Sequence, residues 1–280
     1  LSPLTLINVL FPIFKIVFTT KIILITNLIF SSINRNIDKM TYNKTRNIDL
    51  ENEKNFENSK VRDEQIRSAQ SKYYWSVDLF VKKHEQLTFE TIKNKTILEI
   101  GCSIGDDAEN YVLHCKEYVG IDISDEAIDV AKSKKIPKSI FRCTDGHKIP
   151  FKNNTFDCVI VNSLLHHLNL KISIEEISRV LCKKGKLIFR EPLGTNPLIQ
   201  FYRLVTPNSR TVDEKPFDLD DIKLLNIYFN MKNIQWFGFL NILSAFIKNN
   251  FIRLFLSNID QILSYTILKY FFWQISGILE

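Results

Sequence analysis

The chain has 280 residues, with 37 basic and 31 acidic side chains and a formal net charge of +6. Hydrophobic residues make up 45% of it, which indicates a globular protein and excludes a disordered one. The basic excess is too small for a nucleic-acid-binding surface, although it permits weak attraction to an anionic membrane. Five widely spaced cysteines without a C-x-x-C pair predict no disulfide framework and no metal site, and reduced thiols fit a cytoplasmic protein.

Residues 1–39 form an apolar N-terminal segment, and the first Met of the chain is Met40. Lys15 and Lys21 divide it into runs too short for a membrane-spanning helix. Three interpretations stay open: upstream sequence that does not belong to a natural protein starting at Met40, a membrane-anchoring or interfacial helix, and a helix packed on the domain. Residues 40–68 are polar and rich in charge, so we expect a linker or a solvated helix and a globular domain at 69–280.

Five short runs rich in Val, Ile or Leu predict β-strands in the middle of the chain. They are Thr96–Ile100, Tyr118–Asp122, Ser139–Cys143, Asp157–Asn162 and Lys186–Arg190. Amphipathic helical patterns separate most of them, with Ser124 as the expected N-cap of one helix and Ser173-x-x-Glu176 as the expected capping box of another. This alternation predicts an α/β fold with a doubly wound, mostly parallel sheet, which binds ligands beyond the carboxyl ends of its strands.

The turn after the first predicted strand contains two glycines but does not fit a dinucleotide-binding loop. Counted from Gly101, the three positions of G-x-G-x-x-G hold Gly101, Ser103 and Asp106, so only one matches. Asp106 and Asp107 suit a helix N-terminus, but they would repel a pyrophosphate. A cationic sulfonium ligand meets no such repulsion.

Acidic residues also follow the next two predicted strands. Asp122 ends the second strand, where a carboxylate can accept hydrogen bonds from both ribose hydroxyls of a nucleoside. Asp145 follows the third strand in Thr144-Asp145-Gly146, where it could accept from an adenine amino group. Each acid alone also fits a local role at a strand end or a turn, but such roles explain poorly why they occur at successive strand ends.

Five motifs in order resemble the class I S-adenosylmethionine-dependent methyltransferases. They are ILEIGCSIGDDA, YVGIDIS, RCTDGHKIPF, FDCVIVNSLLHHL and EISRVLCKKGKLIFREP, and they are most similar to the small-molecule enzymes of the ubiquinone/menaquinone-biosynthesis type. The resemblance implies S-adenosylmethionine as the cofactor and a seven-stranded sheet. It also implies a set of cofactor-binding residues: Glu99, Gly101, Cys102, Ser103 and Gly105 at the methionine part, Asp122 at the ribose, Ile123, Asp145 and Gly146 at the adenine, and Asn162 at the methionine end. Glycine is more common in the family where Ser103 stands.

His166 and His167 are the candidate catalytic residues, because both lie just past the fourth predicted strand. Methyl transfer from a sulfonium needs mainly alignment, and a general base helps when the acceptor is a hydroxyl or an acidic carbon. Adjacent helical residues point about 100° apart, so we expect at most one of the two to face the site. The alternative for each is a packing or helix-start histidine.

Two further groups have a functional and a structural interpretation. The first comprises Tyr73, Tyr74 and Trp75, which precede the first strand and would either cover the site as part of a lid or pack in the core. The second lies in residues 192–216, which we expect to form an acceptor-side loop. Arg203, Arg210, Asp213 and Glu214 would there line the acceptor pocket or form an ion network.

The C-terminal part is apolar and aromatic. The sixth and seventh strands are expected near Ile234–Phe239 and Phe272–Ile278, with the seventh antiparallel. Residues 240–268 would form an apolar helical insertion that either packs as core or contacts a membrane surface. In the second case the acceptor is lipid-soluble, and the protein is a cytoplasmic one in peripheral contact with the membrane.

The sequence therefore predicts transfer of a methyl group from S-adenosylmethionine to a small-molecule acceptor, with no nucleic-acid partner. One alternative is a catalytically inactive protein of the same fold that binds at a membrane. The other is an NAD(P)-linked oxidoreductase, which the missing glycines disfavour.

Overall fold

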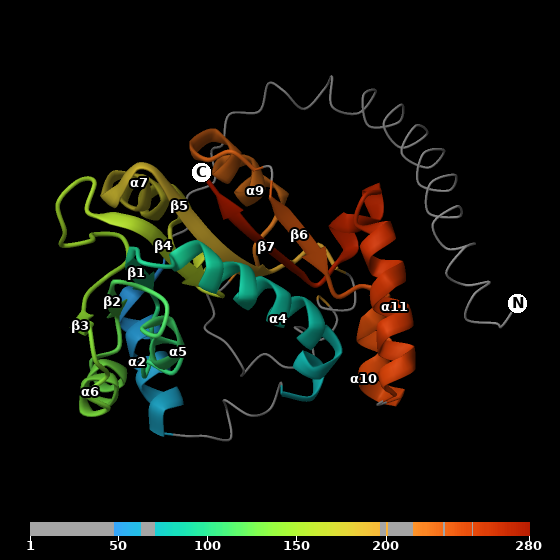
Figure 1. Ribbon diagram of the computed structural model, residues 1–280, viewed down its shortest axis with the longest axis horizontal. Helices are drawn as coiled ribbons and strands as arrows, with labels where there is room; N and C mark the ends of the chain where they lie inside the picture. Colours follow the sequence, from blue (N-terminus) through green and yellow to red (C-terminus); the bar gives the residue numbers. More distant parts are fainter. Residues whose placement is uncertain (1–47, 63–70, 197–199, 201–214, 232, 248) are drawn as a thin grey trace, which may run out of the picture.

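The computed structural model describes residues 48–62, 71–196, 200, 215–231, 233–247 and 249–280. At its centre is a seven-stranded sheet in the order β3-β2-β1-β4-β5-β7-β6, in which only β7 runs antiparallel to its neighbours (Figure 1). The prediction of a doubly wound, mostly parallel seven-stranded sheet is confirmed. The strands are β1 (Thr96–Ile100), β2 (Glu117–Asp122), β3 (Ser139–Cys143), β4 (Phe156–Asn162), β5 (Leu181–Pro192), β6 (Ile234–Phe237) and β7 (Gln274–Leu279).

Helices cover both faces of the sheet, and two buried clusters of side chains fill the space between the layers. On one face lie α4 (Ser71–Ile92), α5 (Ala108–Tyr111) and α6 (Asp125–Ser133), which pack on strand residues such as Ile97, Ile160 and Ile188. On the other face lie α7 (Leu170–Val180) and α9 (Leu219–Tyr228). Side chains of a strand point alternately to its two faces, so each strand serves both clusters.

The ends of two helices test the capping predictions. Ser124 is the N-cap of α6, since its hydroxyl oxygen accepts a hydrogen bond from the Ala127 N–H at 3.0 Å. The capping box at Ser173 is wrong. Asn169 begins α7 instead, because its side-chain oxygen accepts from the Ile172 N–H, and Ser173 lies buried inside the helix.

Part of the segment expected as a polar linker or solvated helix forms a helix that packs on the domain. Helix α2 (Leu50–Arg62) lies beside α6, with Asn58 buried. The side-chain amide of Asn58 donates to Asp125 at 3.1 Å and accepts from the Ser124 hydroxyl at 2.5 Å. A polar contact, rather than an apolar stripe, therefore attaches α2 to the sheet layer.

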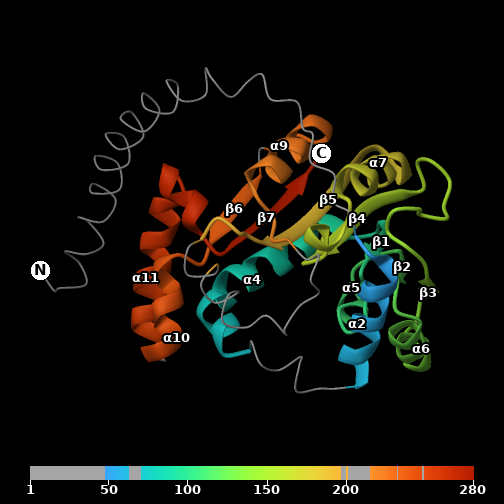
Figure 2. The same ribbon diagram turned by 180° about the vertical axis from the view of Figure 1, so that it is seen from behind.

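The connection from β6 to β7 is helical. It comprises η3 (Leu240–Leu243), α10 (Ser244–Ile247), α11 (Asn250–Leu263) and η4 (Ile267–Phe271), and α10 and α11 lie side by side near β6 in both views (Figures 1 and 2). Strand β6 ends two residues earlier than predicted, just before Gly238 with its φ of +86°. No helix in the described part of the chain is long and apolar enough to cross a membrane.

Candidate cofactor site

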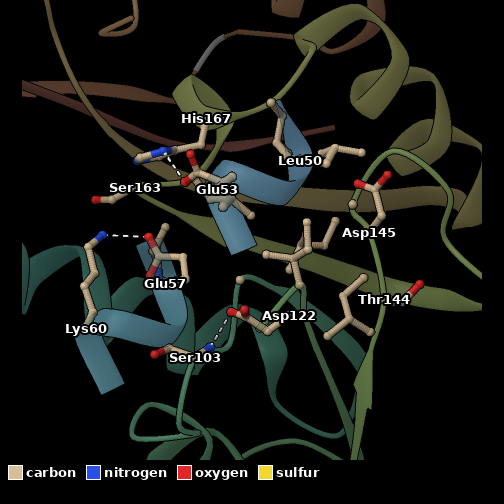
Figure 3. A pocket seen from close by; sticks show the side chains of 18 residues that line it. Leu50, Glu53, Glu57, Lys60, Ser103, Asp122, Thr144, Asp145, Ser163 and His167 are labelled. Carbon is tan, nitrogen blue, oxygen red and sulfur yellow. Dashed lines mark hydrogen bonds and ion pairs between the residues drawn. The ribbon is translucent and has the colours of Figure 1, made fainter. Parts of the chain in front are cut away.

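A pocket lies at the carboxyl ends of β1, β2 and β4, where a doubly wound sheet binds its ligands. Seven of the ten predicted cofactor-binding residues line it: Gly101, Ser103, Asp122, Ile123, Asp145, Gly146 and Asn162. They come from four separate strand ends, so the sheet topology brings together residues that lie up to 61 positions apart in the sequence. Figure 3 shows the labelled carboxylates of Asp122 and Asp145 around this space.

The turn after β1 brings the backbone close to the pocket. Gly101 has a φ of +78°, and a Cβ there would lie 2.8 Å from Cδ2 of Leu164. Ser103 also lies in the left-handed region, with a φ of +46°. That conformation favours glycine, which accounts for the glycine more often found there in the family.

Asp122 connects the end of β2 to this turn. One carboxylate oxygen accepts from the Ser103 N–H at 2.8 Å, and the other accepts from the Ser124 N–H at 2.9 Å. Burial raises the pKa of Asp122, although these two hydrogen bonds oppose the shift. Each oxygen of a carboxylate has a second lone pair, so both can still accept a hydrogen bond from a ribose hydroxyl.

Asp145 is held by a histidine that the sequence analysis did not single out. Nε2 of His147 accepts from the Asn169 N–H at 2.8 Å, so in the neutral ring the proton lies on Nδ1, 2.6 Å from Asp145. Burial raises the pKa of Asp145, but the hydrogen bonds from His147 outweigh that effect, and the net shift is downward. Asp145 is therefore an ionised acceptor at the pocket edge.

Three of the predicted cofactor-binding residues do not line the pocket. Glu99 is buried behind it and accepts a hydrogen bond from the Tyr118 hydroxyl, and burial raises its pKa to about 8. The Cys102 side chain is also buried, and the Gly105 N–H donates to the Cys102 carbonyl at 2.9 Å to close the turn. Cys102 and Gly105 thus shape the turn itself, whereas Glu99 lies buried in β1.

The two candidate catalytic histidines have different surroundings. His167 lines the pocket, with Nδ1 2.8 Å from the Glu53 carboxylate (Figure 3). His166 is buried, with Nδ1 2.6 Å from the Glu191 carboxylate. Glu191 also accepts from the Leu164 and Leu165 N–H groups, and burial raises its pKa to about 7. As expected for neighbouring residues, only one of the two faces the pocket.

Helix α2 forms a wall of the pocket that the sequence analysis missed. Leu50, Glu53, Glu57 and Lys60 all line it, and Lys60 forms an ion pair with Glu57. A surface helix is recognised by its apolar stripe, whereas α2 turns a mostly polar side toward the domain. The recurrence of Glu53, Glu57 and Lys60 at helical spacing was the one available signal.

The charges around the pocket are mainly negative. Glu53, Glu57, Asp122 and Asp145 line it with a single lysine, Lys60. Such a surface attracts a cation and repels a pyrophosphate. The geometry and the charge together fit a nucleoside that carries a positive sulfur.

Comparison with known proteins finds a family match for the middle of the chain. Residues 98–189 match the family model described as a methyltransferase domain. This part of the chain is similar to a methyltransferase domain. The resemblance to S-adenosylmethionine-dependent methyltransferases that the five motifs indicate is thereby confirmed.

Individual relatives agree with this family. A phthiotriol/phenolphthiotriol dimycocerosates methyltransferase of Mycobacterium leprae is 29% identical over 117 residues, which cover 40% of this chain and 43% of the relative. A ubiquinone biosynthesis O-methyltransferase of Coxiella burnetii is 26% identical over 118 residues, 41% of this chain and 50% of the relative. The chain spans about half the length of most curated relatives it matches, and 65% of one from Methanocaldococcus jannaschii.

A solved structure shows the shared fold. The geranyl diphosphate C-methyltransferase of Streptomyces coelicolor has a TM-score of 0.55 and 13% sequence identity to this chain. The match covers 72% of this chain and 79% of the other.

Two groups of residues expected near the methyltransferase site are placed only in part. Trp75 contacts α11, with the guanidinium of Arg253 4.5 Å from its ring, so it packs between helices. The side chains of Tyr73 and Tyr74 lie outside those described, as do Arg203, Arg210, Asp213 and Glu214 of the expected acceptor-side loop.

Proposed function

We propose that this chain transfers a methyl group from S-adenosylmethionine to a small-molecule acceptor. The observation that carries the proposal is the pocket itself, in which Asp122 is fixed by two backbone N–H groups beside a turn with three residues at positive φ. S-adenosylmethionine would supply a methyl group on a positively charged sulfur, which an acceptor attacks in line. The carboxylates around the pocket would attract that positive charge and so favour binding of the cofactor.

The pocket residues divide between the parts of the cofactor. Asp122 accepts from the ribose hydroxyls, and Asp145, with Gly146 and Ile123, holds the adenine. The turn at Gly101 and Ser103 allows the sulfur and the methionine chain to lie close to the backbone. Cys102 and Gly105 hold that turn in shape, whereas Glu99 lies buried in β1.

His167 is the residue we assign to proton transfer when the acceptor is a hydroxyl or an acidic carbon. It lines the pocket, and the Glu53 carboxylate orients its ring. A carboxylate on Nδ1 fixes the ring and stabilises its protonated form, as it does for other histidine bases. His166, held by Glu191 outside the pocket lining, acts as a positioning residue for the segment after β4.

The acceptor we favour is lipid-soluble, because α11 buries polar side chains and exposes apolar ones, the reverse of an ordinary surface helix. Its buried residues are the polar Ser257 and Asp260, whereas Phe251, Leu254 and Phe255 are each more than half exposed. An apolar face of this kind fits peripheral contact with a membrane surface, where such an acceptor dissolves. Two relatives are named for ubiquinone and for dimycocerosates, which supports the same class.

Titration calorimetry with S-adenosylhomocysteine tests the cofactor site. In the Asp122→Ala variant we expect affinity to fall about 30-fold or more, because each lost charge-assisted hydrogen bond contributes about 1.5–3 kcal/mol. Asp129→Ala is the matched control, since it removes an exposed carboxylate from α6 outside the pocket. If the folded wild-type protein fails to bind, or if both variants bind equally well, the proposed function is wrong.

A further inference from the structure

Helix α2 contributes a charged pair to the wall of the cofactor pocket. Nζ of Lys60 lies 2.6 Å from Oε1 of Glu57, and both residues line the pocket (Figure 3). Their side chains are only 29% and 28% exposed. The ammonium of Lys60 also lies over the ring of Phe56, 4.5 Å from its centroid. The pair is therefore held in place from two sides, as part of the pocket wall.

Neighbouring contacts keep Glu57 close to Asp122. Asn58, the next residue of α2, accepts a hydrogen bond from the Ser124 hydroxyl at 2.5 Å. The Ser124 N–H in turn donates to the Asp122 carboxylate at 2.9 Å. Burial is the main cause of the raised pKa of Asp122, and the negative charge of Glu57 adds to it. The two carboxylates thus border the same part of the pocket and repel each other.

The charges of Asp122, Glu57 and Lys60 limit what can bind between them. A phosphate would be repelled by both carboxylates, and a cation would be repelled by the ammonium. A neutral hydroxyl suits both kinds of group, because its hydrogen donates to a carboxylate and its oxygen accepts from an ammonium. Since there are two carboxylates, two adjacent hydroxyls match this part of the pocket.

All three groups retain hydrogen-bonding capacity for such a diol. An ammonium has three donors and a carboxylate has about four acceptor sites, so the contact between Lys60 and Glu57 uses only part of what they offer. The two oxygens of Asp122 each accept one backbone N–H and have a second lone pair. A diol between the carboxylates would therefore replace their repulsion by charge-assisted hydrogen bonds.

We propose that Glu57 and Lys60 bind the ribose of the cofactor together with Asp122. The two ribose hydroxyls divide between the carboxylates of Asp122 and Glu57, and one of them also accepts from Lys60. This inference rests on the proposed function. It goes beyond the family motifs, which assign the ribose to Asp122 alone, because α2 lies outside the residues 98–189 that match the family model. A helix outside the shared domain then sets the preference for ribose over deoxyribose.

Calorimetry of the full chain with S-adenosylhomocysteine and its 2′-deoxy and 3′-deoxy analogues tests the inference. The analogue without the hydroxyl that Glu57 holds should bind the wild type about tenfold more weakly than S-adenosylhomocysteine. Glu57→Ala should weaken S-adenosylhomocysteine by about the same factor and leave that analogue within about twofold. Glu51→Ala is the matched control, since it removes an exposed carboxylate of α2 outside the pocket lining and should change none of the affinities.

Lys60→Met is the second variant, because it removes the ammonium and keeps the apolar stem. It should weaken S-adenosylhomocysteine at least about threefold. Equal losses for the three ligands in Glu57→Ala would overturn the inference, and faster amide hydrogen exchange in α2 would then identify Glu57 as a residue that only holds the helix. No loss in Glu57→Ala would overturn it too.

The same titrations separate this inference from the proposed function. A wild-type protein that binds S-adenosylhomocysteine with no dependence on Glu57 rejects the role of α2 alone. A folded wild-type protein that binds none of the three ligands rejects the proposed function as well.

Discussion

Glu99 is buried behind the pocket, and the pKa of its carboxyl group is raised to about 8 from an ordinary 4.5. This shift makes the free energy of unfolding depend on pH. The main cause of this pKa shift is burial, followed by repulsion from the Asp107 carboxylate. As the pH rises from about 5 to about 8, the unfolded chain loses this proton before the folded chain does. The free energy of unfolding should therefore fall over this interval, by an amount on the order of 3 kcal/mol from this group.

Urea unfolding at the two ends of that interval measures the effect. In Glu99→Gln the fall in the free energy of unfolding between about pH 5 and pH 8 should be clearly smaller than in wild type. Glu117→Gln serves as the control, because Glu117 is an exposed acid at the start of β2. An unchanged pH dependence in Glu99→Gln would contradict the raised pKa.

At the scale of single residues, the sequence indicates the pocket acids but not their surroundings. Asp122 and Asp145 could be predicted because strand ends are read from short apolar runs, and these ends converge in a parallel sheet. The contacts of His147 with Asp145 and of Glu53 with His167 could not be predicted, since they depend on how the loops and α2 pack. Glu99 lies behind the pocket because it is buried within β1, two residues before Gly101.

At the scale of elements, the strands followed from local pattern and α2 did not. The bounds of β1 and β3 agree with the predicted ones, because both are short apolar runs beside clear turns. Helix α2 packs through Asn58 and Glu53, and such polar contacts leave no periodic signal in the sequence.

The contact between Glu53 and His167 should control how firmly α2 is held. The two side chains are each about 10% exposed. Loss of this ion pair in Glu53→Gln should therefore lower the free energy of local opening of α2 by about 1 kcal/mol. Amide hydrogen exchange in Leu50–Arg62 should then quicken about fivefold, with exchange in α7 unchanged. Glu51→Gln on the exposed side of α2 should have no effect, and equal exchange in both variants would disprove the contact's role.

At the scale of the whole molecule, the exposed apolar face of α11 predicts affinity for a membrane surface. The protein should cosediment with vesicles of phosphatidylcholine and phosphatidylglycerol, and the double variant Phe251→Ser, Phe255→Ser should bind at least about tenfold more weakly. Ile227→Ser, which removes an exposed apolar side chain from α9, is the matched control. Cosedimentation that is absent in wild type, or equal in the double variant, would reject the membrane contact.

The position of α2 has a consequence for the rates of ligand exchange. One wall of the pocket is a helix held by polar contacts, so its opening is a local event that does not require the sheet to unfold. We expect the observed rate of nucleoside association to level off at high ligand concentration, at the rate at which α2 opens. Loosening α2 would then raise the association and dissociation rates together, whereas removing the Asp122 carboxylate would raise the dissociation rate alone.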